Sequence, residues 1–236
     1  MVDESSRPQQ PSGGGNGSGR GVQRDAVVNA FMALLAEKRF EDIGFAEIAR
    51  RAGVSLSELR AKHASKIEML AAHMREVDRA VLDGIDTGMA DEPPRERLFD
   101  VLMRRLDLLA PDKAAIQSLQ RSVLLNPGLT LALNGLSVRS MQWMLTAADI
   151  SATGPKGAVR AQGLALMFAS VIRTWLRDDD PGQARTLAAL DRALSSGQRW
   201  SGLLDDLCRI PEAACNVRRS VRRRRDDRRD SESAAA

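Results

Sequence analysis

The sequence FEDIGFAEIARRAGVSLSELRAKHASKIEML, residues 40–70, carries the strongest structural signal in this chain. The spacing of its apolar residues predicts two short helices, one over residues 45–52 and one over residues 56–62. Gly53 suits the left-handed turn that ends a helix, and Ser55 stands three residues before a glutamate, which is the capping-box pattern that starts the next helix. Two short helices joined by a glycine-containing turn predict a helix-turn-helix.

Basic side chains are concentrated in this region. Five of them, between Arg50 and Lys66, are opposed by one acid, which gives a local charge of +4. A solvated helical face is the alternative interpretation of such a cluster. In a helix-turn-helix, the start of the second helix meets base edges in the major groove of double-stranded DNA, and flanking groups hold phosphates. The candidate DNA-binding residues are therefore Ser55, Leu56, Ser57, Glu58, Arg60, Lys62 and Lys66.

The rest of the chain continues the helical pattern. Only 3% of the 236 residues are aromatic and there is no Tyr, which disfavours a β-sandwich. Helical periodicity predicts an all-α fold of about nine helices, with an N-terminal three-helix domain that contains the helix-turn-helix and a C-terminal helical domain. The predicted helices lie near residues 22–38, 45–52, 56–62, 65–83, 93–110, 112–125, 128–148, 156–177 and 183–207.

Composition divides the chain into four predicted parts. Residues 1–20 are rich in Gly, Ser, Pro and Gln and are expected to be a disordered arm. The helix-turn-helix domain spans residues 21–70, and a helical regulatory and dimerisation domain spans residues 71–210. Residues 211–236 are expected to be an Arg-rich disordered tail that contacts either nucleic-acid phosphates or acidic lipid headgroups. Within this tail, residues 216–236 carry eight Arg against four acids and account for the whole net charge of +4, so the basic pI describes the tail and not the body.

Several function classes are disfavoured by what the sequence lacks. It shows no apolar leader and no apolar run of about 20 residues, so we expect a cytoplasmic protein with no transmembrane segment. Cys208 and Cys215 are expected to be free thiols, because two cysteines and two histidines make a poor disulfide framework and a poor zinc site. Without a phosphate-binding loop or a catalytic motif, we expect no enzyme, no cofactor and no metal.

Residues 24–70 resemble the DNA-binding domain of the TetR family of bacterial transcription regulators. The resemblance rests on a first helix at residues 26–38, on EIARRAGVS at residues 47–55, and on the Ser65-Lys66 pair. It covers about a fifth of the chain. It implies a homodimer that binds a palindromic DNA site, with two recognition helices about 34 Å apart, and that responds to a small apolar ligand.

The sequence departs from the family pattern at five positions. The Tyr and His that usually hold phosphates are replaced by Arg60 and Lys62, which still donate hydrogen bonds and add charge. Gly44 replaces the usual Ser or Thr cap, and His63 replaces a core Phe, where we expect a buried, hydrogen-bonded histidine. Leu56 replaces a polar residue and offers only an apolar contact. Phosphate holding is therefore expected to persist, with few groups left for reading bases.

The resemblance also implies that the last two helices form the dimer interface. An apolar stripe on the helix near residues 156–177 could serve this purpose, or it could face the core of its own protomer. The stripe consists of Leu164, Met167, Phe168, Val171, Ile172 and Trp175.

A ligand pocket would lie among the helices of residues 93–150, where methionines could adapt to a flexible apolar molecule. Plain core packing is the alternative for each candidate. The candidate lining is Leu102, Met103, Leu106, Leu119, Val123, Leu133, Met141, Trp143 and Met144.

A second resemblance concerns the C-terminal region. Residues 95–116 and 173–194 look similar to the lipid-binding accessory family of coenzyme Q biosynthesis. This resemblance implies an alternative function, in which the chain binds an isoprenoid lipid and the helix-turn-helix is vestigial.

Overall fold

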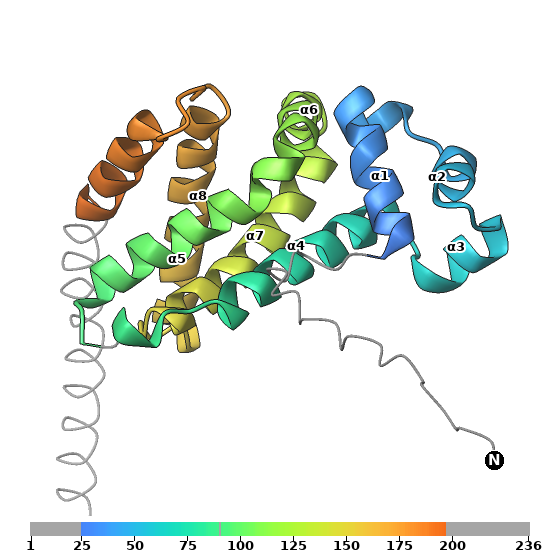
Figure 1. The fold of residues 1–236 in the computed structure, drawn as a ribbon. Coiled ribbons are helices and arrows are strands. Elements are labelled where there is room, and N and C mark those ends of the chain that lie inside the picture. Colours follow the sequence, from blue (N-terminus) through green and yellow to red (C-terminus); the bar gives the residue numbers. More distant parts are fainter. Residues whose placement is uncertain (1–24, 90, 197–236) are drawn as a thin grey trace, which may run out of the picture.

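The structure is a computed structural model that describes residues 25–89 and 91–196. Within these ranges the chain is helical and forms no strand, which confirms the all-α prediction (Figure 1). The predicted arm (residues 1–20), the predicted tail (residues 211–236) and the two cysteines lie outside the described residues.

Eight α-helices are joined by short connections, and a further helical segment covers residues 184–196. Three short 3₁₀ turns lie at Phe40–Asp42, Thr87–Met89 and Ala110–Asp112. The last predicted helix, residues 183–207, is thus described only as far as residue 196. The helices are α1 (Ala26–Glu37), α2 (Phe45–Ala52), α3 (Leu56–Lys62), α4 (Lys66–Asp83), α5 (Pro94–Leu109), α6 (Lys113–Val123), α7 (Pro127–Ala147) and α8 (Gly154–Trp175).

The ends of the first three helices follow from local chemistry. The Asp25 carboxylate accepts a hydrogen bond from the Val27 amide at 2.8 Å and starts α1. Gly53 ends α2 with φ of +69°, a conformation that favours glycine because it has no Cβ. Ser55 then caps α3 by accepting from the Glu58 amide, as the capping-box pattern predicts.

Two hydrophobic cores hold the helices together. The first, here called the head core, fixes α1–α3 and consists of Val27, Val28, Phe31, Met32, Leu34, Leu35, Phe40, Ile43, Ile48, Ala49, Leu59, Met69, Leu70, Ala115 and Leu129. The second, here called the body core, joins α4, α5, α7, α8 and the segment 184–196. It consists of Val77, Val81, Leu98, Val101, Leu102, Leu106, Leu109, Met141, Met144, Leu145, Ala148, Ala161, Leu164, Ala165, Phe168, Val171, Trp175, Leu176, Leu190 and Leu194.

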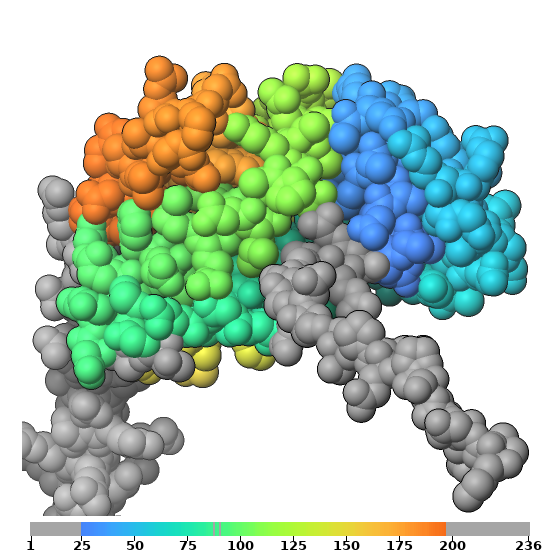
Figure 2. Space-filling model, viewed as in Figure 1, coloured from blue at the N-terminus to red at the C-terminus, as the bar shows by residue number. Residues whose placement is uncertain are grey.

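The head core extends beyond residue 70, where the sequence predicts the end of the first domain. Helix α6 lies directly against α1 (Figure 2) and contributes Ala115 to the head core. The Ser118 hydroxyl donates to the Lys38 carbonyl at 2.8 Å, and the Ser122 hydroxyl accepts from the Phe40 amide at 3.2 Å. Both serines are buried, so α6 is held to the head by polar contacts as well as by apolar packing.

Candidate nucleic-acid interface

Helices α2 and α3 lie at one end of the molecule, and α8 and the segment 184–196 lie at the other end (Figure 1). Leu59 fixes the inner face of α3, because it is only 2% exposed and belongs to the head core. The outer face of α3 is therefore directed away from the head core. This placement makes the outer face available to a large partner such as a DNA duplex.

The first turn of α3 uses most of its polar groups internally. The Ser55 hydroxyl donates to the Glu58 carboxylate at 2.8 Å, and the Ser55 amide donates to the same oxygen at 2.8 Å. These two donors hold the pKa of Glu58 below its ordinary value. Both residues are exposed, but their hydrogen-bonding groups already have partners within the capping box.

Three other residues on the outer face of α3 are exposed. Leu56 is 54% exposed, so its apolar side chain is available to a partner. Ser57 and Arg60 are also exposed, and neither makes a side-chain hydrogen bond or ion pair with another described residue. Leu56 and Arg60 are four residues apart and therefore lie on the same side of the helix.

Lys62 is exposed at the end of α3 and is paired with the start of α1. Its Nζ lies 3.3 Å from Asp25 Oδ2. The pKa of Asp25 is lowered mainly by the hydrogen bond from the Val27 amide, and Lys62 adds to the effect. An exposed pair of this kind contributes little to stability. Lys62 can therefore exchange Asp25 for a phosphate at small cost.

Lys66 differs from its predicted role as a phosphate contact. Its Nζ donates to the Phe40 carbonyl at 2.6 Å and to the Ile43 carbonyl at 3.0 Å, and it lies 4.4 Å from the centre of the Phe40 ring. Burial lowers the pKa of Lys66. Two of its three donors are thus occupied, and the structure gives Lys66 the role of holding the turn before α2.

Further pairing reduces the local charge of +4. Arg51 forms an ion pair with Glu37. Lys62 is bound to Asp25, and Lys66 is bound to carbonyls. Arg50 and Arg60 are therefore the two basic residues of this cluster that form no side-chain hydrogen bond or ion pair with another described residue. A count of charges between residues 50 and 66 misses Asp25 and Glu37, because both lie outside that window.

The N-terminus of α2 also departs from the family pattern, as the sequence predicts. Gly44 makes no side-chain capping bond, and the Phe45 side chain next to it is exposed. Sequence reasoning did not single out Phe45. His63, expected to be a buried and hydrogen-bonded residue, is buried, but neither ring nitrogen has a hydrogen-bond partner within the described part of the chain.

The predicted dimer stripe on α8 faces the protomer's own core, which is the second of the two alternatives. The body core contains Leu164, Phe168, Val171 and Trp175, and Met167 and Ile172 are partly buried against it. These six residues therefore form no free surface. This packing disfavours the prediction that they form the dimer interface.

The predicted ligand-lining residues do not come together around a cavity. Leu102, Leu106, Met141 and Met144 are buried in the body core, with Met103 packed against it. Leu119 instead packs against the head core, as do Val123 and Leu133, and Trp143 is exposed. For the four buried residues the alternative of plain core packing holds.

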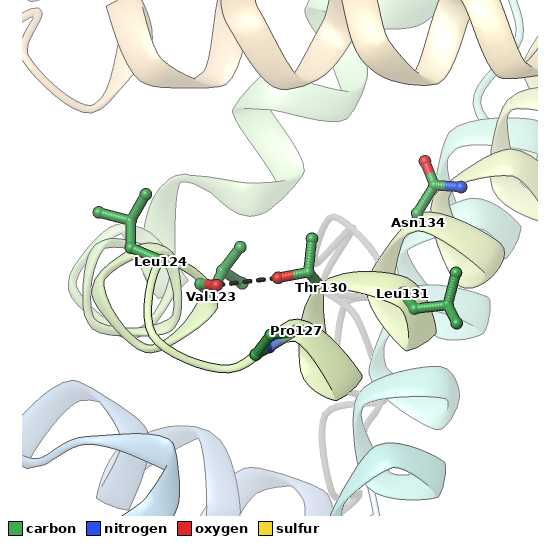
Figure 3. Close-up of a pocket in the computed structure, with 6 residues that line it drawn as sticks. All are labelled: Val123, Leu124, Pro127, Thr130, Leu131 and Asn134. Atoms are coloured by element: carbon green, nitrogen blue, oxygen red, sulfur yellow. Dashed lines mark hydrogen bonds between the residues drawn. The ribbon is translucent and has the colours of Figure 1, made fainter.

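Two cavities open on the described surface, and neither contains any of the residues Leu102, Met103, Leu106, Leu119, Met141, Trp143 or Met144. One, of about 340 Å³, lies between the end of α4, α5 and the end of α7. The other, of about 460 Å³, lies at the turn between α6 and α7 (Figure 3). It is lined by Val123, Leu124, Pro127, Thr130, Leu131 and Asn134, and the Thr130 hydroxyl donates to the Val123 carbonyl across it at 2.8 Å.

Large apolar side chains are exposed around this second cavity and along α7 and α8. Their exposed fractions range from 51% to 83%. Between the two helices, Asn134 and Gln162 exchange a reciprocal pair of amide hydrogen bonds at 3.0 and 3.1 Å. We call these exposed side chains of the α6–α7 turn, α7 and α8 together the exposed apolar face, and they are Leu124, Leu125, Leu131, Trp143, Val159 and Leu166.

Solved structures with a similar fold are TetR-family transcriptional regulators. A TetR transcriptional regulator from Nitrosomonas europaea is 24% identical, with a TM-score of 0.59 over 74% of this chain and 96% of its own. One from Rhodococcus sp. RHA1 is 23% identical, with a TM-score of 0.52 over 73% of this chain and 93% of its own. A third, from Streptomyces coelicolor, is 14% identical, with a TM-score of 0.51 over 77% of this chain and 82% of its own.

The chain therefore has the fold of the TetR-family transcriptional regulators, in which the head provides a helix-turn-helix. No protein-family model matches the sequence, and no curated protein is significantly similar to it. Across the described part of the chain, no helix is both long enough and apolar enough to span a membrane.

Proposed function

We propose that this protein is a transcription regulator that binds double-stranded DNA through α3 as a homodimer. The observation that carries the proposal is the outer face of α3, where Leu56, Ser57 and Arg60 are exposed while Leu59 anchors the helix in the head core. A recognition helix needs such an arrangement, with a rigid inner face and an unoccupied outer face.

The proposed roles follow from which groups are already bound. Arg60 and Lys62 hold phosphates, and Arg50 on α2 is a third candidate because it is exposed and forms no ion pair with another described residue. Ser55, Leu56 and Ser57 face the groove. Glu58 supports Ser55 through the capping box and contacts a base only if that bond breaks. Lys66 positions α2 from beneath the turn.

We propose that the exposed apolar face, in place of the buried α8 stripe, forms the homodimer interface. Leu124 and Leu131 line one cavity together with Asn134, which is bound to Gln162 on α8. Val159 and Leu166 lie two helical turns apart on the same side of α8. The six exposed side chains supply several hundred Å² of apolar surface, compared with about 800 Å² per partner in a standard interface.

The first test removes the phosphate contacts of α3. The double variant Arg60→Ala with Lys62→Ala should weaken DNA binding about tenfold or more and lower the slope of log affinity against log salt by about 1.8. Fluorescence anisotropy with a labelled duplex at several salt concentrations measures both. The matched control, Arg177→Ala with Arg185→Ala, removes the same charge from exposed positions beyond α8 and should leave binding unchanged.

If the affinity and the salt slope of the α3 variant equal those of the wild type, α3 is not the DNA-binding helix. If the control variant loses as much as the α3 variant, binding depends on overall charge and the specific assignment fails.

The second test concerns the dimer. Leu131→Glu with Leu166→Glu places four carboxylates near the two-fold axis and should convert the dimer into a monomer, as seen by light scattering at micromolar concentration. The monomer should lose most of its affinity for a palindromic duplex, because each head then binds alone. Ile85→Glu, an exposed apolar residue off this face, is the control. A dimer that survives the double change would show that another surface joins the two copies.

We do not propose an apolar ligand site at the predicted residues, because four of them fill the body core and, of the nine candidates, Val123 alone lines either of these two cavities. The lipid-binding alternative is not proposed for the same reason.

A further inference from the structure

We propose that α3 recognises thymine through its C5-methyl group, with Leu56 as the specificity-determining residue. This inference rests on the DNA-binding function proposed above. It goes further by naming the chemical group that the first turn of α3 selects in the major groove.

The hydrogen bonds within the first turn of α3 determine which of its groups are free to contact a base. The Ser55 hydroxyl both donates to the Glu58 carboxylate and accepts from the Glu58 amide, at 2.8 and 3.1 Å. The Glu58 carboxylate also accepts from the Ser55 amide. A base edge that used either residue would have to break the bonds that start the helix. Leu56 and Ser57 are the two remaining side chains of this turn.

The second step is the position of Leu56. It is the first residue of α3, and in helix-turn-helix proteins the N-terminal residues of this helix contact base edges. Leu56 is 54% exposed, and its neighbour one turn on, Leu59, is 2% exposed. The short helix therefore buries one leucine for packing and leaves the other on its outer face. Single exposed leucines are common, so the exposure of Leu56 only permits contact with a base. The evidence for that contact is the location of Leu56 at the start of α3.

The chemistry of the Leu56 side chain limits which base it can select. A leucine side chain has no hydrogen-bond donor or acceptor, so it can select a base only by apolar contact. In the major groove, thymine presents a methyl group, whereas the other three bases present donors or acceptors at their edges. Placing Leu56 over cytosine N4 or guanine O6 would bury a polar group without a partner, which is unfavourable. Thymine is therefore the favoured base beneath Leu56.

The fourth step concerns Arg60, which lies one turn further along the same side of the helix. Arg60 is exposed and forms no ion pair with another described residue, so it can reach the DNA backbone next to the same base pair or a neighbouring guanine. An apolar contact followed by a cationic contact also sets the direction in which each half-site is read. We expect the thymine near the outer end of the first turn in each half-site.

The experiment begins with duplexes selected from a random library by the full-length protein. In the best duplex, each thymine is replaced in turn by uracil, which removes only the methyl group. We expect one position in each half-site to lose about fourfold in affinity, the effect of one buried methyl-sized group. Uracil at positions outside the half-sites should have no effect.

The variants then assign the effect to Leu56. In Leu56→Ala, thymine and uracil at the sensitive position should bind equally, while binding at other positions is unchanged. Leu56→Gln offers an amide, so selection should shift from thymine towards adenine at that position. Because Leu56 is exposed, both variants should keep the thermal stability of the wild type. Ile85→Ala, at an exposed apolar residue just beyond the end of α4, should retain the preference for thymine.

A cytosine and a 5-methylcytosine duplex separate the methyl group from the rest of the base. If the methyl group is what Leu56 reads, 5-methylcytosine should bind better than cytosine at the sensitive position. Equal affinity for thymine and uracil at every half-site position would overturn the proposal. So would a methyl preference that persists in Leu56→Ala, because another residue, such as Phe45, would then read the group. Failure to select any duplex over random DNA would instead contradict the proposed function itself.

Discussion

The head core and the body core are stabilised differently. All members of the head core are apolar, and Phe31 and Phe40 meet edge to face, with ring centres 6.2 Å apart. The body core surrounds a buried ion pair, in which Arg105 binds Asp78 and the Ser140 hydroxyl donates to the same carboxylate oxygen at 2.6 Å. In an apolar core, close packing leaves the polar groups around it little room to rearrange. In the body core, the buried ion pair holds three helices in one geometry.

Three helices, α4, α6 and α7, pass through both cores, and α7 contributes Leu129 to the head core and Met141 to the body core. Helix α4 contributes Met69 to the head core and Val77 to the body core, and between them the buried His73 lies 3.8 Å from Asp112. Helix α6 contributes Ala115 to the head core, while Ile116 packs against the body core. Because these helices contribute to both cores, we expect the two cores to unfold together, although they differ in chemistry.

Loss of a head-core aromatic should have the largest effect on stability. Phe31→Ala should lower the free energy of unfolding by about 4 kcal/mol, because Phe31 is completely buried. Of the three tryptophans, Trp143 and Trp175 lie on α7 and α8, so their fluorescence reports on the body, and Trp200 lies outside the described residues. Denaturation followed by fluorescence and by far-UV circular dichroism should shift to the same extent. A shift in circular dichroism alone would show that the head unfolds independently.

Removal of the buried carboxylate should have a similar or slightly smaller effect. Asp78→Ala leaves Arg105 charged and unpaired in the body core and should cost about 3 kcal/mol in urea denaturation. The double variant Asp78→Leu with Arg105→Met replaces the pair by apolar groups and should be clearly more stable than Asp78→Ala. If the two variants are equally unstable, the cost comes from lost packing and not from the unpaired charge.

The smallest effect is expected at the edge of the body. The Thr186 hydroxyl and amide donate to Asp178 at 2.7 and 2.8 Å and hold the pKa of Asp178 below its ordinary value. A carboxylate with a lowered pKa adds stability above its unfolded pKa and loses it as the pH falls through the folded value. Asp178→Asn should therefore lose less stability than the wild type between roughly pH 5 and pH 3. Melting temperatures across this range measure the difference, and parallel curves would contradict it.

Most of the fold could be predicted from the sequence, because its determinants are local. The turn at Gly53 and the cap at Ser55 need only their neighbours, and the structure confirms both. The role of Lys66 could not be predicted, since its partners are carbonyls of Phe40 and Ile43, whose directions depend on the folded turn.

The surfaces of α8 show the other limit of sequence reasoning. Apolar periodicity identifies a face that will be covered, but not whether the cover is the same chain or another one. The predicted stripe is covered by its own protomer, and the exposed leucines Leu131 and Leu166 do not follow a regular helical pattern. Only the packing of α7 against α8 distinguishes the two faces.

The attachment of α6 to the head limits how this protein can be divided. A fragment ending at residue 70 would uncover the side of α1 that α6 protects, and the Phe40 amide and Lys38 carbonyl would lose their serine partners. Chimaeras that exchange DNA-binding heads between regulators would therefore have to carry α6 with the head, although more than 40 residues separate α6 from α3 in sequence. In this chain, the part that could be transferred to another protein is defined by contacts in the folded structure and not by one continuous segment of the sequence.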